Sequence, residues 1–279
     1  MDGLGPFLLF TAIMSSRESS LTAFVDSLQR QAQYSFTRNQ AAATLSASPG
    51  TLTKALQRLQ AAGRIHRVRK GFFTIVPLEH ADAGNIPTDW FIADLMRFLD
   101  IPYYVGALTA AAYHGAAHQQ PQEFHIVIAQ SMRMIKTGKV RVRFLRFEGL
   151  PAADTQPMKS FTGTFPVSTP EQTALDLVRF QKHIGGFDAV MTVLAELVEK
   201  MSGPALLQAV RREPSVAQVQ RLGWLLDHIK ARALAAELAE WVERRHPAVI
   251  PLNGSLRSRK GSVDRKWRLI LNDSPEGEL

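Results

Sequence analysis

The segment from residue 46 to residue 77 constrains the fold most, because a capped helix is followed there directly by a basic hairpin. Ser48 and Pro49 start the helix, since serine is a favoured N-cap and proline suits the first helical position. Gly63 follows its expected end. The buried face would consist of three leucines, Leu52, Leu56 and Leu59. Alternating apolar and polar residues then flank the turn at 69–71, which predicts a β-hairpin.

Two shorter helices are predicted before this segment. The first has an apolar stripe at helical spacing, made by Leu21, Phe24, Val25 and Leu28. The second would run over residues 38–45 with Thr37 as its N-cap. Three helices followed by a hairpin are the element order of a winged helix-turn-helix, which we expect over residues 19–78.

In such a fold the third helix enters the major groove of double-stranded DNA, and the hairpin lies on the phosphate backbone or in the minor groove. The helix face opposite the leucines carries the residues that would meet the bases, namely Thr51, Lys54, Gln57 and Arg58. The hairpin carries those that would bind phosphate, namely Arg67, Arg69 and Lys70. The alternative is a small protein-interaction domain with a solvated basic face, because a fold does not dictate a function.

The charge distribution favours the DNA-binding interpretation. Residues 1–80 contain nine Lys and Arg against four acids, a net charge of +5. The other 199 residues contain 24 bases and 21 acids, a net charge of +3. The excess positive charge is therefore concentrated where the winged helix is predicted.

Residues 88–279 are expected to form a larger mixed domain after a linker at 78–87, so the fold class is α+β, with an N-terminal winged helix-turn-helix and a helix-rich C-terminal domain. A helix to Leu99 would begin at Thr88 or Asp89 and bury Trp90, Phe91, Leu95 and Phe98. A helix rich in small residues is expected at 107–114, and strands at 124–129, 140–147 and 161–167.

The remainder of this domain is predicted to be mainly helical. Ser168 would cap a helix with Pro170 just inside and Glu171 completing a capping box. Helical patterning then continues to about residue 245, with breaks at 203–204 and near Pro214. A final strand is expected at 267–271.

A second basic patch lies on the strand predicted at 140–147. No acidic residue occurs between 131 and 147. The six members of the patch are Arg133, Lys136, Lys139, Arg141, Arg143 and Arg146. The patch could hold DNA backbone, RNA or an acidic partner. It could equally be an exposed sheet edge that is protected by charge, which is a common device in β-proteins.

Several classes are excluded or disfavoured. Cysteine is absent, so disulfides and cysteine-ligated metals are excluded, and a reducing cytoplasm fits. No apolar run approaches the ~18 residues of a transmembrane helix. We interpret residues 1–18 as disordered or as a mis-assigned start, with Met14 as an alternative start, because a signal peptide would need early positive charge.

We expect no catalytic site, no metal and no cofactor. Phosphate-binding and nucleophile-elbow motifs are missing. His114 and His118 have the spacing of two metal ligands, but Gly115 interrupts their helix. A metal-dependent nuclease remains the enzyme alternative, with its acid and lysine at 264–266. A nucleotidyltransferase is disfavoured, because Lys266 stands where its second carboxylate belongs.

Three stretches of the chain resemble the AbiEi antitoxin family of the AbiE (type IV) abortive-infection system. They are GTLTKAL at 50–56 with GRIHRVRKG at 63–71, YVGALTAAAYHG at 104–115, and STPEQTALDL at 168–177. With the C-terminal strand, the resemblance covers about residues 20–272. It implies an autorepressor that binds inverted repeats upstream of its own operon through the winged helix. It also implies that the larger domain counteracts a nucleotidyltransferase toxin, with which it need not form a stable complex.

Overall fold

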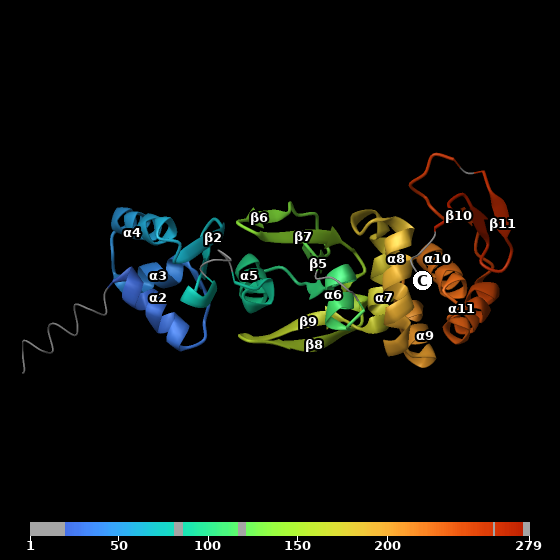
Figure 1. The fold of residues 1–279 in the computed structure, drawn as a ribbon, viewed down its shortest axis with the longest axis horizontal. Coiled ribbons are helices and arrows are strands. Elements are labelled where there is room, and N and C mark those ends of the chain that lie inside the picture. Colours follow the sequence, from blue (N-terminus) through green and yellow to red (C-terminus); the bar gives the residue numbers. More distant parts are fainter. Residues whose placement is uncertain (1–19, 81–85, 117–120, 259, 276–279) are drawn as a thin grey trace, which may run out of the picture. The chain divides into compact units, whose positions relative to one another are not determined.

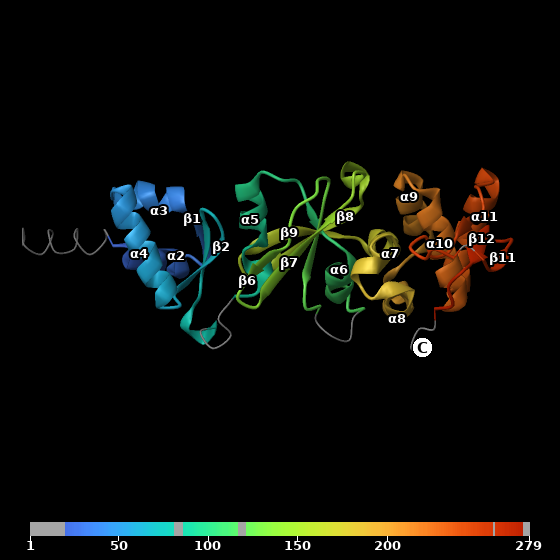
Figure 2. The same ribbon diagram turned by 90° about the horizontal axis from the view of Figure 1, so that it is seen from above.

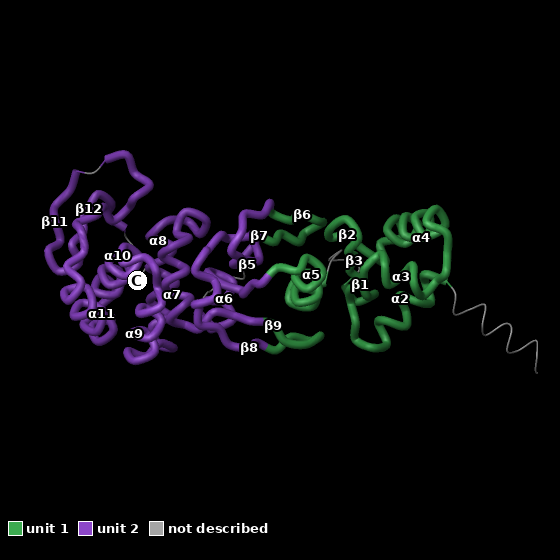
Figure 3. Tube along the Cα trace, turned by 180° about the vertical axis from the view of Figure 1, so that it is seen from behind, with its two compact units in different colours: residues 1–101, 134–142, 159–165 green, residues 102–133, 143–158, 166–279 purple. Residues whose placement is uncertain are grey.

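The computed structural model describes residues 20–80, 86–116, 121–258 and 260–275, so the expectations for residues 1–18 lie outside it. The chain is mixed α+β, as predicted (Figure 1). It divides into two compact units (Figure 3). Unit 1 comprises residues 1–101, 134–142 and 159–165, and unit 2 comprises residues 102–133, 143–158 and 166–279. Within the described ranges, no helix is both long and apolar enough to cross a bilayer.

The first part of unit 1, residues 20–76, is called the N-terminal module below. Its elements are, in order, α2 (Leu21–Arg30), β1 (Ser35–Thr37), α3 (Arg38–Leu45), α4 (Pro49–Ala61), β2 (Ile65–Arg69) and β3 (Phe72–Ile75). The strands form an antiparallel sheet in the order β1-β3-β2. The three helices and the hairpin lie where the sequence predicts them, whereas β1 was not expected, because three residues are too few to show an alternation.

Side-chain caps fix the ends of these helices. The Thr37 hydroxyl accepts the amide of Gln40, whose side chain accepts the amide of Thr37 in return. Ser48 accepts the amide of Thr51 at the start of α4. On the inner face of α4, Leu52 and Leu56 are buried and Leu59 is partly buried. The predicted caps and the predicted leucine face are therefore confirmed.

The rest of unit 1 includes helix α5 (Ile92–Leu99), which follows the short 3-10 turn η2 (Thr88–Trp90). The single helix expected from residue 88 is thus interrupted at Phe91. Phe91 and Leu95 are buried as predicted. Phe98 is 38% exposed and lies against Phe72, while Trp90 is only half-buried. The prediction of burial was wrong for these two rings, because each covers an edge of the N-terminal module and not the interior.

A six-stranded sheet follows, in the order β6-β7-β5-β4-β9-β8. Its strands are β4 (Tyr104–Val105), β5 (Phe124–Ile128), β6 (Ile135–Thr137), β7 (Val140–Arg146), β8 (Thr155–Ser160) and β9 (Gly163–Ser168). Strand β7 lies between β6 and β5, so the basic strand is not the sheet edge that the charge-protection interpretation assumed. Short strands β4, β6 and β8 were missed because none shows a clear alternation.

Helices complete unit 2, and Figure 2 shows α9, α10 and α11 beside the small terminal sheet. They are α6 (Ala107–Tyr113), α7 (Pro170–Arg179), α8 (Gly186–Leu197), α9 (Gly203–Arg212), α10 (Val216–His228) and α11 (Arg232–Arg245). The terminal sheet has the order β10-β12-β11, from β10 (Ile250–Pro251), β12 (Leu269–Leu271) and β11 (Ser262–Asp264). Trp267 is fully buried there, and a Cβ on Gly223 would lie 1.9 Å from its ring. A break at 229–231 was not expected.

The cap of α7 differs from the prediction by one residue. Thr169, not Ser168, is the N-cap, and its hydroxyl accepts the amide of Gln172. Ser168 ends β9, and its hydroxyl lies 2.7 Å from the Thr173 hydroxyl. Glu171 is buried and accepts the amide of Ser202 at the start of α9. The correction has a local cause, since proline at the first helical position makes its immediate neighbour the cap.

Candidate nucleic-acid interface

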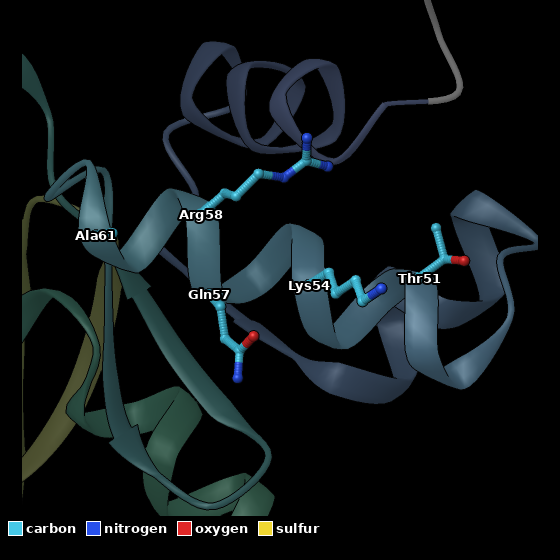
Figure 4. Close-up of a pocket in the computed structure, with 5 residues that line it drawn as sticks. All are labelled: Thr51, Lys54, Gln57, Arg58 and Ala61. Atoms are coloured by element: carbon cyan, nitrogen blue, oxygen red, sulfur yellow. The ribbon is translucent and has the colours of Figure 1, made fainter.

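One face of α4 is exposed along its whole length. The predicted base-facing residues all lie on it, and Figure 4 shows their side chains spread along one helix: Thr51, Lys54, Gln57 and Arg58. With Ala61 they line an open pocket of about 630 Å³. The opposite face carries Leu52 and Leu56, which are 1% and 3% exposed. Burial of the leucines therefore fixes which side chains α4 presents to solvent.

The basic hairpin, β2 and β3 with their turn, presents the predicted phosphate-binding residues. Arg67, Arg69 and Lys70 are exposed, whereas Val68 is buried and the strand register shifts between the two arginines. Gly71 adopts φ +85° in the turn, a conformation that favours glycine. Arg69 already takes part in an interaction within the protein. The hairpin thus exposes its three basic side chains to solvent, while the Val68 side chain between the two arginines is buried.

The N-terminal module has little negative charge to balance these cations. No acidic residue occurs between Asp26 and Glu79. Arg64 is neutralised by Asp26, with an N···O distance of 2.7 Å. Among the described residues, none forms a hydrogen bond or ion pair with the side chains of Lys54, Arg58, Arg67 or Lys70. Exposed cations that the protein itself leaves uncompensated attract polyanions.

The second basic patch is divided by the structure. Within unit 1, the Thr137 hydroxyl donates to the carbonyl of Arg67 at 3.3 Å, which places the β6–β7 hairpin beside β2. Lys136 and Arg141 are opposite one another in this hairpin, and both are exposed, as is Lys139. These cations therefore continue the surface of the basic hairpin.

The other patch residues behave differently. Arg143 forms a two-pronged ion pair with Glu123, with one N···O distance of 3.0 Å. Arg146 pairs with Glu148 at 2.5 Å. Arg133 is exposed. The stretch without acids that grouped these six residues in the sequence thus ends just before Glu148, and Glu123, which lies before it, neutralises Arg143.

In unit 2 a buried polar cluster joins the second and third family-like stretches. The Tyr104 hydroxyl and the side-chain amide of Gln172 both donate to Asp176 Oδ1, at 3.1 and 3.0 Å. Asp176 is fully buried, and this loss of solvation raises its pKa to about 7, although nearby Arg179 opposes the shift. A Cβ on Gly106 would lie 2.9 Å from Asp176 Oδ2. The sequence analysis missed this cluster.

Arg179 extends the cluster to a second acid. It pairs with Glu213 and lies over the Phe147 ring, 3.8 Å from the ring centroid. The Glu213 and Arg179 side chains are only 1% and 11% exposed. A carboxylate–guanidinium pair this deeply buried holds elements together more readily than it binds a ligand.

The residues considered for metal or nuclease chemistry have structural partners. His114 Nε2 lies 2.8 Å from the Ser168 carbonyl, while His118 falls outside the described residues. Asp264 accepts the amide of Trp267, and Lys266 pairs with Asp227. Among the described residues, no three His, Asp or Glu side chains are grouped to hold a metal ion.

Residues 104–228 match the family model for the AbiEi antitoxin C-terminal domain. This segment of the chain is therefore similar to the AbiEi antitoxin C-terminal domain. The match confirms the resemblance found in the sequence, and it covers the elements that bring Tyr104, Gln172 and Asp176 together. It supports an antitoxin of an abortive-infection system and, in general terms, a toxin partner.

A solved structure has a similar fold over most of the chain. The crystal structure of RV2827C protein from Mycobacterium tuberculosis matches this chain with a TM-score of 0.63 and 17% sequence identity. The match covers 88% of this chain and 89% of that one. At this identity the likeness shows the fold alone. No curated protein sequence matches the chain significantly.

Proposed function

We propose that this protein is an antitoxin that represses its own operon, with the N-terminal module acting as a winged helix-turn-helix on double-stranded DNA. The observation that carries the proposal is the exposed face of α4 beside the basic hairpin, in a stretch with no acidic residue from 27 to 78. Of the partners weighed for a basic surface, DNA fits best, because it accepts a helix in its groove and cations along its backbone.

Helix α4 has suitable dimensions and side chains for the major groove. It contains 13 residues, which corresponds to about 20 Å. Lysine and arginine recognise guanine, and glutamine recognises adenine, through hydrogen bonds to base edges. Thr51 and Lys54 near the start of α4 would lie closest to the bases, because recognition helices use their N-terminal residues. Gln57 and Arg58 would extend the contact.

The basic hairpin would follow the phosphate backbone. Arg67, Arg69 and Lys70 supply the charge, and the β6–β7 hairpin adds Lys136 and Arg141 alongside β2. Phosphate contacts of this kind release counterions, so they strengthen binding to all sequences and weaken as salt rises. Inverted repeats in the operator would be occupied by two copies of α4, one on each half-site.

A gel-shift experiment tests this proposal directly. The full chain is titrated against DNA from immediately upstream of its own gene and against a scrambled duplex, at two salt concentrations. We expect tighter binding to the upstream DNA and a steep loss of affinity with salt. Substitution of the exposed base Arg232 on α11 serves as a matched control. Equal, salt-insensitive binding to both duplexes would instead favour a protein-interaction module.

We assign the antitoxin activity to residues 104–228, which match the AbiEi antitoxin C-terminal domain and lie mostly in unit 2. It would counteract a nucleotidyltransferase toxin encoded beside this gene, without requiring a stable complex between the two proteins. Co-expression tests this assignment. A variant with Lys54→Ala and Arg58→Ala should lose operator binding and still protect cells from the neighbouring gene product. Loss of protection in that variant would contradict a division of labour between the two units.

A further inference from the structure

Arg38 is in contact with both DNA-facing elements of the N-terminal module. It is the first residue of α3, and its backbone amide donates to the Gly71 carbonyl in the turn of the basic hairpin, at 2.8 Å. Its guanidinium Nη2 donates to the Pro49 carbonyl at 3.1 Å and to the Thr53 hydroxyl at 2.8 Å. Both acceptors lie within the first five residues of α4. One residue therefore joins the hairpin turn to the start of α4.

The placement of this guanidinium is not explained by helix electrostatics. The N-terminal end of a helix is the positive end of its dipole, which favours anions. Neither α3 nor α4 has an acidic residue in its first turn. A cation at this position gains its hydrogen bonds but no favourable dipole interaction. Its contacts fix the geometry between α3, α4 and the hairpin turn.

We infer that Arg38 is a positioning residue, which holds the exposed face of α4 at a set orientation to the basic hairpin and thereby sharpens sequence discrimination. This inference rests on the proposed DNA-binding function. Thr53 is the second residue that this inference requires. Its hydroxyl accepts from Arg38 and donates to the Pro49 carbonyl at 2.7 Å, so it locks the guanidinium to the helix turn.

The test compares Arg38→Met, Thr53→Val, the double variant and Thr53→Ser, all in the full chain. Arg38→Met keeps the aliphatic stem and removes the donors, whereas Thr53→Val keeps the shape and removes the hydroxyl. We expect each to lower the ratio of operator to scrambled affinity by about tenfold, with the salt dependence unchanged. The double variant should lose little more than Arg38→Met alone, because the two substitutions disrupt the same linked set of contacts. Thr53→Ser should behave like the wild type.

A direct phosphate contact by Arg38 would give a different pattern. Arg38→Met would then reduce the salt dependence by about one counterion, Thr53→Val would be silent, and the inference would be overturned. Additive losses in the double variant would overturn it as well. Melting temperatures that stay within about 3 °C of wild type show that the variants are folded.

Hydrogen exchange without DNA separates this inference from the proposed function. Amides in the first turn of α4 should exchange at least about threefold faster in Arg38→Met and Thr53→Val than in wild type and Thr53→Ser. Unchanged exchange would show that Arg38 does not hold this turn. If the wild type binds neither duplex, the proposed function fails, while the exchange rates still report whether Arg38 holds α4.

Discussion

Arg58 of the N-terminal module and three arginines of unit 2 are used in opposite ways. On α4, Arg58 is exposed and makes no hydrogen bond or ion pair with a described residue. In unit 2, Arg143 pairs with Glu123, Arg179 with Glu213, and Arg212 with Asp154. The residue type is the same, but only the second group is neutralised by the protein itself.

This difference shows that net charge alone is a poor guide to a binding surface. A paired arginine inside a fold contributes to specificity of structure, and breaking the pair leaves a buried charge. An unpaired arginine on an exposed helix face costs the fold almost nothing and remains available to a ligand. Substitution of the two kinds should therefore separate stability from binding.

The largest effect is expected from Arg179→Ala. Removing this guanidinium leaves the buried carboxylate of Glu213 without its partner, which should destabilise the protein by about 3–5 kcal/mol. Urea unfolding followed by tryptophan fluorescence measures the change. Arg58→Ala is the matched control and should alter stability by less than about 0.5 kcal/mol. Comparable losses in the two variants would refute the contrast between paired and unpaired arginines.

Lys54→Ala and Arg58→Ala should instead change sequence preference. Each removes a predicted base contact, at a cost of about 1–3 kcal/mol in operator binding. Binding to the scrambled duplex should fall much less. Fluorescence anisotropy with a panel of single-base operator variants would reveal which position loses its discrimination. A uniform loss over all sequences would mean that these residues contact only phosphate.

Asp176→Asn should change how stability depends on pH. Burial raises the pKa of Asp176 to about 7, so its folded carboxyl keeps a proton that the unfolded chain releases near pH 4. The stability that this group contributes is fully present below about pH 4 and is lost as pH rises through about 7. Asparagine cannot ionise, so the variant does not lose this stability. Between pH 5 and pH 8 the unfolding free energy of the wild type should therefore fall by about 1–2 kcal/mol relative to that of the variant. Parallel curves of unfolding free energy against pH would contradict the raised pKa.

The smallest effect is expected at the β6–β7 hairpin. Lys136→Ala and Arg141→Ala should each weaken binding to operator and scrambled DNA equally, by about threefold, and lower the salt dependence slightly. Lys70→Ala on the basic hairpin should do the same more strongly. The relevant measurement is affinity at four salt concentrations. Arg146→Ala is the control, because Glu148 already neutralises that side chain.

The N-terminal module could be predicted because its signals are local. A cap at Thr37 or Ser48, the leucines of α4 and the glycine at 71 each act within a few residues. The exposed face of α4 could then be predicted as well, because the buried leucines determine which side chains of the helix face solvent. Strand β1 escaped detection because its pairing with β3 is a contact between distant residues.

The polar cluster of unit 2 could not be predicted for the same reason. Tyr104 and Asp176 are 72 residues apart in the chain, and neither lies in a local sequence pattern that would predict a buried hydrogen bond. Likewise, no local pattern around Arg143 indicated that Glu123, which directly precedes the neighbouring strand β5, would neutralise it. Pairing between distant residues decides which charges remain on the surface.

The division into units has an evolutionary consequence. Residues 134–142 and 159–165 belong to unit 1, although the strands that carry them continue in unit 2. Phe161 at one of these tips stacks on Trp90, with ring centroids 4.7 Å apart. A gene fusion that exchanged residues 1–101 for another module would leave both tips without their packing partners. Under the proposed function, operator preference should therefore change by point substitution on α4 more readily than by exchange of whole modules.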